Sequence, residues 1–154
     1  MSSTFSQIYI KVVFAVKGRQ SLIQHSWEEN LYKYITGIVQ YKGQKMLAIN
    51  GMPDHIHLLI GMKPNCSLSD LIREIKKSSN EFVKENKFCN GFNSQEGFGA
   101  FSYSHSQLDN VVKYVMNQKE HHKVKTFEEE YLELLQKFEV KFKEEYLFEW
   151  ISDA

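Results

Sequence analysis

The sequence predicts an α+β fold in which one antiparallel sheet carries two helices on one face. The order of strand-like and helix-like segments, a short turn between two central strands and the length of 154 residues support this prediction. A chain of this length can bury a core of its own, so we expect one domain over residues 1–154. It should comprise a sheet-and-helix core at residues 1–105 and a C-terminal helical segment at residues 106–154.

The first half of the core should be a strand, a helix and a pair of strands. Residues 7–16 are rich in β-branched and aromatic side chains, which is typical of a buried strand. Residues 26–41 place apolar side chains three and four positions apart and predict a helix. Residues 45–50 and 55–62 are strand-like. The Gly, Pro and Asp between them predict a short turn, so the two strands should be antiparallel neighbours.

The second half of the core should add a helix and a fourth strand. Residues 67–85 carry an apolar stripe with charges between its members, and residues 98–104 resume a strand after an Asn- and Gly-rich loop. The order strand, helix, strand, strand, helix, strand, with right-handed crossovers, builds a ferredoxin-like sheet, the arrangement also used by RNA-recognition modules. Both helices should cover one face, and we expect the other face to stay open.

Two further helices are expected after the core, at residues 107–122 and 127–138. The end of the chain, residues 144–150, contains Tyr, Leu, Phe and Trp and is too apolar to be a free tail. We expect it to pack against the body of the protein or against a second subunit.

The net charge of zero conceals an uneven distribution. Residues 1–125 contain 16 Lys and Arg against 10 Asp and Glu, whereas residues 126–154 contain 3 against 9. A basic body suits a nucleic-acid partner, because Lys and Arg neutralise phosphates. We interpret the acidic tail as a solvated helix face, in preference to an internal DNA mimic or a docking segment.

Composition also predicts the cellular compartment of the protein. No stretch approaches the roughly 18 consecutive apolar residues of a membrane span, so we expect no membrane partner and a cytoplasmic protein. Cys66 and Cys89 are too few for a zinc ribbon or a disulfide framework and should be reduced thiols.

The most informative motif is the histidine pair His55 and His57 in the run MPDHIHLLIGM. On a strand, side chains two apart point to the same face, so both imidazoles would lie together while Ile56 points away. Such a pair is by itself more often structural than metal-binding. An open sheet face would favour the metal interpretation, because ligands need access.

A second pair lies on the third expected helix. Tyr114 and Gln118 are four residues apart and should share one helix surface. The Gln118 amide oxygen could be a third ligand to a divalent cation, and the Tyr114 phenol a nucleophile for phosphodiester chemistry. Imidazole ligands alone would favour zinc, manganese or cobalt over magnesium. His121 and His122 lie near a helix end, and we expect them to be solvated or to face DNA.

These stretches together resemble a known family, the single-tyrosine HUH transposases of small bacterial insertion sequences and their relatives associated with repetitive extragenic palindromes (REP). HIH alone is a weak signal, but HIH combined with GFGAFS and a tyrosine four places before a glutamine is specific. The matching stretches cover most of residues 7–125 and are KVVFAVKGRQSLI, MPDHIHLLI, SLSDLIREIKKSSNEFV and QEGFGAFSYSHSQLDNVVKYVMNQKEHHK.

The resemblance implies a metal-dependent DNA transposase. His55, His57 and Gln118 would hold Mg²⁺ or Mn²⁺, and Tyr114 would attack single-stranded DNA to give a 5′-phosphotyrosine and a free 3′-hydroxyl. The partners implied are DNA hairpins at the ends of a mobile element and a second copy of the chain, in a homodimer whose sites are completed in trans.

Contacts to DNA are expected from basic side chains on the body of the protein. The candidates are Lys11, Lys17, Arg19, Arg73, Lys76, Lys77, Lys113 and Lys119. Two alternatives remain open, a domesticated endonuclease specific for hairpins and a non-catalytic module that binds single-stranded nucleic acid.

Overall fold

The computed structural model describes residues 3–151, so the expected domain limits at residues 1 and 154 lie outside the described part. None of its helices is long and apolar enough to cross a membrane. The elements are β1 (Tyr9–Ala15), α1 (His25–Tyr41), β2 (Lys45–Met52), β3 (His55–Gly61), α2 (Leu68–Glu85), β4 (Gly99–Tyr103), α3 (Leu108–Met116), α4 (Gln118–His121) and α5 (Phe127–Lys137), with short 3₁₀ turns at Arg19–Ser21, His105–Gln107 and Glu144–Tyr146.

The four strands form one antiparallel sheet in the order β2-β3-β1-β4. This is the ferredoxin-like order, and it confirms the predicted α+β fold. Strands β2 and β3 form the expected hairpin, joined by the turn at Pro53 and Asp54. The central strands β1 and β3 pair over their whole length, with Val13 opposite His57 and Ala15 opposite His55.

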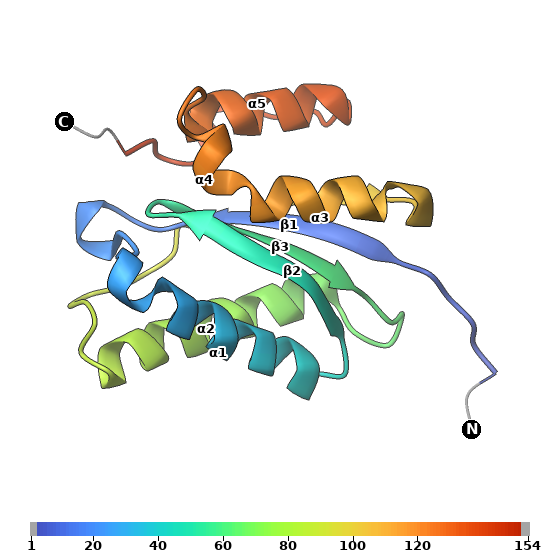
Figure 1. Cartoon of the computed structure of the whole chain (residues 1–154), viewed down its shortest axis with the longest axis horizontal. Coiled ribbons are helices and arrows are strands. Elements are labelled where there is room, and N and C mark those ends of the chain that lie inside the picture. Colours follow the sequence, from blue (N-terminus) through green and yellow to red (C-terminus); the bar gives the residue numbers. More distant parts are fainter. Residues whose placement is uncertain (1–2, 152–154) are drawn as a thin grey trace.

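Helices α1 and α2 cover one face of the sheet, as predicted (Figure 1). They bury the apolar stripes that identified them in the sequence, and Leu31 and Ile35 of α1 and Ile75 of α2 are fully buried there. Helix α2 begins at a well-formed cap, in which the Ser67 side chain accepts a hydrogen bond from the backbone N–H of Asp70. This layer is the main apolar core of the protein.

The opposite face is not open, contrary to our expectation. Helices α3, α4 and α5 lie across it (Figure 1). Helix α3 packs Val111 and Val115 on the β2–β3 half, and α5 packs Leu134 and Leu135 in the cluster that includes Phe101 of β4. The apolar positions of the C-terminal segment therefore cover the sheet, and the histidine strand is sandwiched between two helical layers.

The expected helix at residues 107–122 is divided into α3 and α4. Asn117 leaves helical geometry with φ −99° and ψ 21°, so α4 starts in a new direction at Gln118. The amine of Lys119 contributes to this path, because it donates to the carbonyl of Gly51 and pairs with Glu28 at 3.0 Å. These contacts tie α4 to the layer below it.

The end of the described chain packs on the body of the protein, one of the two outcomes we expected. Phe148 is buried in an aromatic cluster with Phe127 and Tyr131 of α5, and Trp150 packs against the same rings. The buried Gln95 ties this segment to the core. Its side-chain NH₂ donates to the carbonyl of Glu149 at 2.8 Å, and its side-chain oxygen accepts from the N–H of Glu149 at 2.6 Å. The C-terminal segment is thus part of the folded unit.

Candidate metal centre and nucleophile

His55 and His57 lie on the same face of β3, as the two-residue period predicted, and both are fully buried beneath the C-terminal helices. His55 is held from both sides. Its Nδ1 donates to the carboxylate of Asp54 over 2.7 Å, and its ring stacks on Phe127 with centroids 3.8 Å apart. A carboxylate behind a histidine fixes the ring orientation, and here it turns Nε2 toward α4 and α5.

Gln118 and Tyr114 reach the same place from the helices. Gln118 is fully buried, and its amide oxygen lies 3.3 Å from Nε2 of His55. The Tyr114 ring lies edge-on to His57, with centroids 6.0 Å apart. One chain therefore brings all four predicted site residues together.

The centre of the cluster is Glu130 of α5, a residue that the sequence analysis did not single out. Its Oε1 lies 3.0 Å from Nε2 of His57 and 3.4 Å from Nε2 of His55. Its Oε2 accepts hydrogen bonds from the Tyr114 hydroxyl and, at 3.1 Å, from the Gln118 amide. We had interpreted the acidic tail as a solvated helix face. That interpretation fits the exposed Glu128 but is wrong for Glu130, which is 3% exposed.

His122 also belongs to the cluster, so the expectation that it is solvated or faces DNA is wrong. Its Nε2 lies 3.1 Å from Oε1 of both Gln118 and Glu130. The reason is the break at Asn117, which redirects α4 and brings the end of this helix over the sheet. His121, by contrast, packs its ring against Tyr114 at 4.5 Å and makes none of these contacts.

The donor atoms are arranged as a cation would require. His55, His122 and Glu130 offer three ligand atoms that all lie within 4.8 Å of one another. Two donors about 2.1 Å from one cation lie about 3.0 Å apart at an octahedral angle and about 3.4 Å apart at a tetrahedral angle. The Gln118 amide oxygen and the Glu130 carboxylate oxygen each lie 3.1 to 3.4 Å from Nε2 of His55 and of His122. These distances fall in that range. The residues therefore fit a divalent cation.

His57 fits this donor group less directly. Its Nε2 has a hydrogen-bond contact with Glu130 alone, and its Nδ1 is buried without a hydrogen-bond partner among the described residues. Burial lowers the pKa of His57 to about 3, so its ring is neutral, the form in which imidazole binds metals. Burial would also lower the pKa of His55, but hydrogen bonds with Asp54 and Glu130 outweigh it and raise that pKa.

The electrostatics of the cluster keep Glu130 ionised and Tyr114 protonated. Burial alone would raise the pKa of Glu130, but hydrogen bonds from His122, His55 and His57 hold it well below its usual range. Burial, and then the negative charge of Glu130, raise the pKa of Tyr114. The phenolic proton therefore stays between Tyr114 and its acceptor Glu130.

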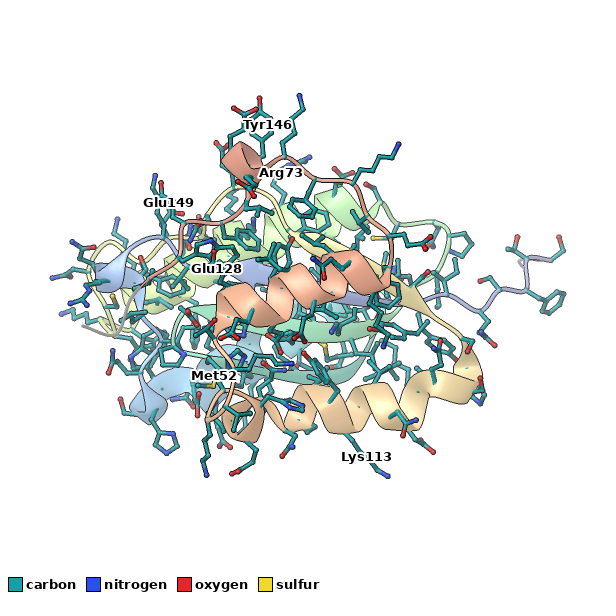
Figure 2. The ribbon with its side chains drawn as sticks, turned by 90° about the horizontal axis from the view of Figure 1, so that it is seen from above. Met52, Arg73, Lys113, Glu128, Tyr146 and Glu149 are labelled. Carbon is teal, nitrogen blue, oxygen red and sulfur yellow. The ribbon has the colours of Figure 1, made fainter. Side chains whose placement is uncertain are left out.

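The predicted DNA-contacting cations are scattered rather than gathered on one surface. Lys11 is only 1% exposed, so it does not lie on the outer surface. It lies beneath α3, with its amine 4.4 Å from the ring centre of Tyr114. Lys17 and Arg19 are exposed in the loop after β1, and Lys113 is exposed on α3, pointing away from the sheet (Figure 2).

Three of the four remaining candidates, Lys76, Lys119 and Arg73, are held by protein groups. Lys76 donates to the carbonyls of Gln95 and Gly97 at 2.8 and 2.7 Å, while Lys119 is tied to α1 and β2. Arg73 pairs with Asp70, and Arg73 and Lys77 are exposed on α2, across the sheet from the histidines. None of these four lies in the histidine cluster.

A ferredoxin-like sheet with paired histidines on a central strand and a tyrosine helix over them agrees with the resemblance to single-tyrosine transposases. A family model described as "Transposase IS200 like" matches residues 4–118. The chain belongs to this family of IS200-like transposases. The matched region ends at Gln118, so His122 and Glu130 lie beyond it.

Individual relatives agree with this assignment. Over 73 residues the chain is 25% identical to ISDra2 transposase TnpA of Deinococcus radiodurans, a match that covers 47% of this chain and 52% of that protein. The chain thus matches only about half the length of this curated relative.

Two solved structures share the fold, each with 18% identity. The crystal structure of a proposed transposase from Deinococcus radiodurans R1 superposes with a TM-score of 0.60, covering 77% of this chain and 95% of that chain. The structure of a REP-associated tyrosine transposase bound to a REP hairpin superposes with a TM-score of 0.59, covering 82% and 78%.

Proposed function

We propose that this protein is a metal-dependent DNA transposase that cleaves and rejoins single-stranded DNA through a phosphotyrosine intermediate. Family membership supports the general activity. The observation that carries the mechanism is the hydroxyl of Tyr114, which lies in one buried cluster with the imidazole, amide and carboxylate donors. A nucleophile beside a candidate cation site is what phosphodiester cleavage requires.

In the proposed reaction, Oη of Tyr114 attacks the phosphorus of a DNA phosphodiester. The new bond joins this oxygen to phosphorus, and the bond between phosphorus and the 3′-oxygen breaks. The products are a 5′-phosphotyrosine on Tyr114 and a free 3′-hydroxyl. Over the whole step the phenolic proton is transferred to the departing 3′-oxygen, so no proton is gained or lost; Glu130 accepts the hydrogen bond of the hydroxyl and orients it before attack. Attack by a 3′-hydroxyl on the same phosphorus reverses the step and rejoins the strand without ATP.

The cation we propose is Mg²⁺ or Mn²⁺. His55, His57 and Gln118 would hold it, as the family resemblance implies, with Glu130 and His122 as further oxygen and nitrogen donors. When bound, it would draw charge from the attacked phosphate and from the leaving oxygen. Asp54 and Phe127 keep the ring of His55 in place for this role.

The DNA partner we propose is a hairpin with adjoining unpaired nucleotides. The fold similarity to a REP-associated transposase bound to a REP hairpin supports this choice. Lys17 and Lys113 are exposed and are our candidates for phosphate contacts. We also propose a homodimer, as the family resemblance implies. Since Tyr114 already reaches the histidines of its own chain, the tyrosine can act in cis.

The test is formation of a covalent protein–DNA adduct. We expect wild-type protein incubated with Mn²⁺ and labelled single-stranded hairpin DNA to give an adduct that survives denaturing electrophoresis. Tyr114→Phe should abolish it, whereas Tyr41→Phe, which alters an 87% exposed tyrosine, should leave it unchanged. Tight binding by wild type without an adduct, or an equal yield from Tyr114→Phe, would exclude this mechanism.

A further inference from the structure

A pocket of about 280 Å³ lies beside Tyr114, and none of the proposed metal ligands lines it. It is bounded by β1, β4, α3 and α5 together with the turn before α3. Its lining is Lys11, Tyr103, Gln107, Asn110, Val111, Tyr114, Leu134 and Lys137. Tyr114 therefore borders two spaces: its hydroxyl contacts Glu130 among the donors, and its ring lines this pocket.

Two amines give the pocket a positive character. Lys11 comes from the centre of the sheet, where a buried lysine is rare and costly because its charge loses water. Lys137 is exposed, at the end of α5. Burial lowers the pKa of Lys11 to about 8. The negative charge of Glu130 acts in the opposite direction, and the positive charge of Lys137 adds a smaller lowering, so the two amines are near enough to repel each other. An anion between the two amines would relieve their repulsion.

The rest of the lining offers groups that suit a nucleobase. Asn110 is exposed on α3, so its amide can both donate and accept hydrogen bonds. The amide oxygen of Gln107 accepts from Ser104, which leaves its NH₂ group to face other acceptors. Tyr103 is half-buried and packs one edge against Phe138, with centroids 5.3 Å apart. Amides that read base edges next to an aromatic ring are typical of single-strand recognition.

We propose that this pocket binds one unpaired nucleotide of the DNA, the one adjoining the phosphate that Tyr114 attacks. Its backbone phosphate lies between Lys11 and Lys137, and its base faces the amides of Asn110 and Gln107. The volume is near the lower end of the ~300–1,000 Å³ of small-molecule sites, which suits one nucleotide and excludes a duplex. A nucleotide seated here holds the next phosphate beside Oη of Tyr114.

This inference deepens the proposed function, on which its assignment to the cleaved strand rests. The binding test is kept separate from cleavage by working in EDTA. We expect Lys137→Ala to weaken binding of a labelled, unstructured oligonucleotide about fivefold at about 0.1 M salt, because one fewer counterion is released. The slope of log affinity against log salt should fall by about 0.7 for the same reason. Fluorescence anisotropy over a salt series measures both.

The matched control is Lys84→Ala, which removes an exposed lysine on α2, on the opposite face of the sheet. It should leave affinity and slope unchanged. Equal behaviour of Lys137→Ala and wild type would overturn the pocket assignment. An equal loss in Lys84→Ala would also overturn it, because the effect would then be one of general charge.

Base reading is tested by cleaving a pool of hairpins with randomised flanking nucleotides in Mn²⁺ and sequencing the DNA captured on Tyr114. Wild type should prefer one base at a single position beside the cut, and Asn110→Ala should lose that preference there alone. An unchanged preference in Asn110→Ala would overturn the assignment of the base. Absence of any adduct from wild type would instead contradict the proposed cleavage, and the binding measurements in EDTA would still decide whether the pocket takes DNA.

Discussion

Glu130 connects the two functional parts of the site. One oxygen of its carboxylate faces three imidazoles, and the other accepts from Tyr114 and Gln118. A buried carboxylate is costly unless it is hydrogen-bonded on all sides. These five donors satisfy that requirement. The carboxylate thereby holds the nucleophile and the proposed metal ligands in one arrangement.

His121, the last residue of α4, and His122, which follows it, should differ in their effect on metal binding. We expect His122→Ala to weaken Mn²⁺ binding at least about tenfold, because it removes a donor that faces Glu130 and Gln118. His121→Ala should change the affinity by less than about twofold, since its ring packs on Tyr114 instead. Isothermal titration calorimetry of both variants measures this difference. Equal losses in the two variants would contradict the role of His122.

The sequence could predict only part of this cluster. His55 and His57 followed from the two-residue period of a strand, and Tyr114 and Gln118 from the four-residue spacing of a helix. Glu130 could not be found in this way, because a glutamate in an acidic helix is usually solvated. The two preceding glutamates, Glu128 and Glu129, favour that interpretation, and only the docking of α5 on the sheet buries the side chain of Glu130.

The helices and strands themselves were largely predictable from periodicity, because each has a clear apolar pattern. The division of the helix at Asn117 was not, since no Gly or Pro marks it in the sequence and the break depends on tertiary contacts of α4. The place of α5 was not predictable either. Its apolar positions showed that it must pack, but the same pattern would suit the body or a second subunit.

The close packing of helix α5 on the sheet depends on Gly99 of β4. A Cβ at Gly99 would lie 2.7 Å from both Cε1 and the hydroxyl oxygen of Tyr131, so Gly99→Ala should push α5 outward. We expect a loss of about 1–3 kcal/mol in the free energy of unfolding, as for other overpacked sites. Urea denaturation followed by circular dichroism measures it.

The control for this substitution is Gly37→Ala in α1, where a Cβ would meet nothing within 4 Å. It should stabilise the protein by up to about 1 kcal/mol, because alanine favours a helix. A Gly99→Ala variant as stable as the wild type would show that Tyr131 and α5 can shift without cost.

The whole molecule has three layers, with the sheet between α1 and α2 on one side and α3 to α5 on the other (Figure 1). The site exists only while α5 stays packed on the sheet, because the histidines of β3 lie on the sheet and Glu130 lies on α5. The chain after α5 turns back over this layer and ends beside Gln95, which lies outside the C-terminal segment. Gln95 therefore links the C-terminal segment to the chain that follows β1.

Loss of this link should loosen the C-terminal layer selectively. Gln95→Ala removes hydrogen bonds to the carbonyl of Val16 at 2.9 Å and to the backbone of Glu149. Unpaired buried backbone groups cost about 1–3 kcal/mol each, so we expect the free energy of unfolding to fall by about 2–3 kcal/mol. Hydrogen exchange should become faster at residues 127–150 and stay unchanged in α1 and α2, because local opening needs only the outer layer to detach. Gln136→Ala, an exposed position of α5, should leave exchange as in the wild type. Uniformly faster exchange in Gln95→Ala would show instead that the layers unfold together.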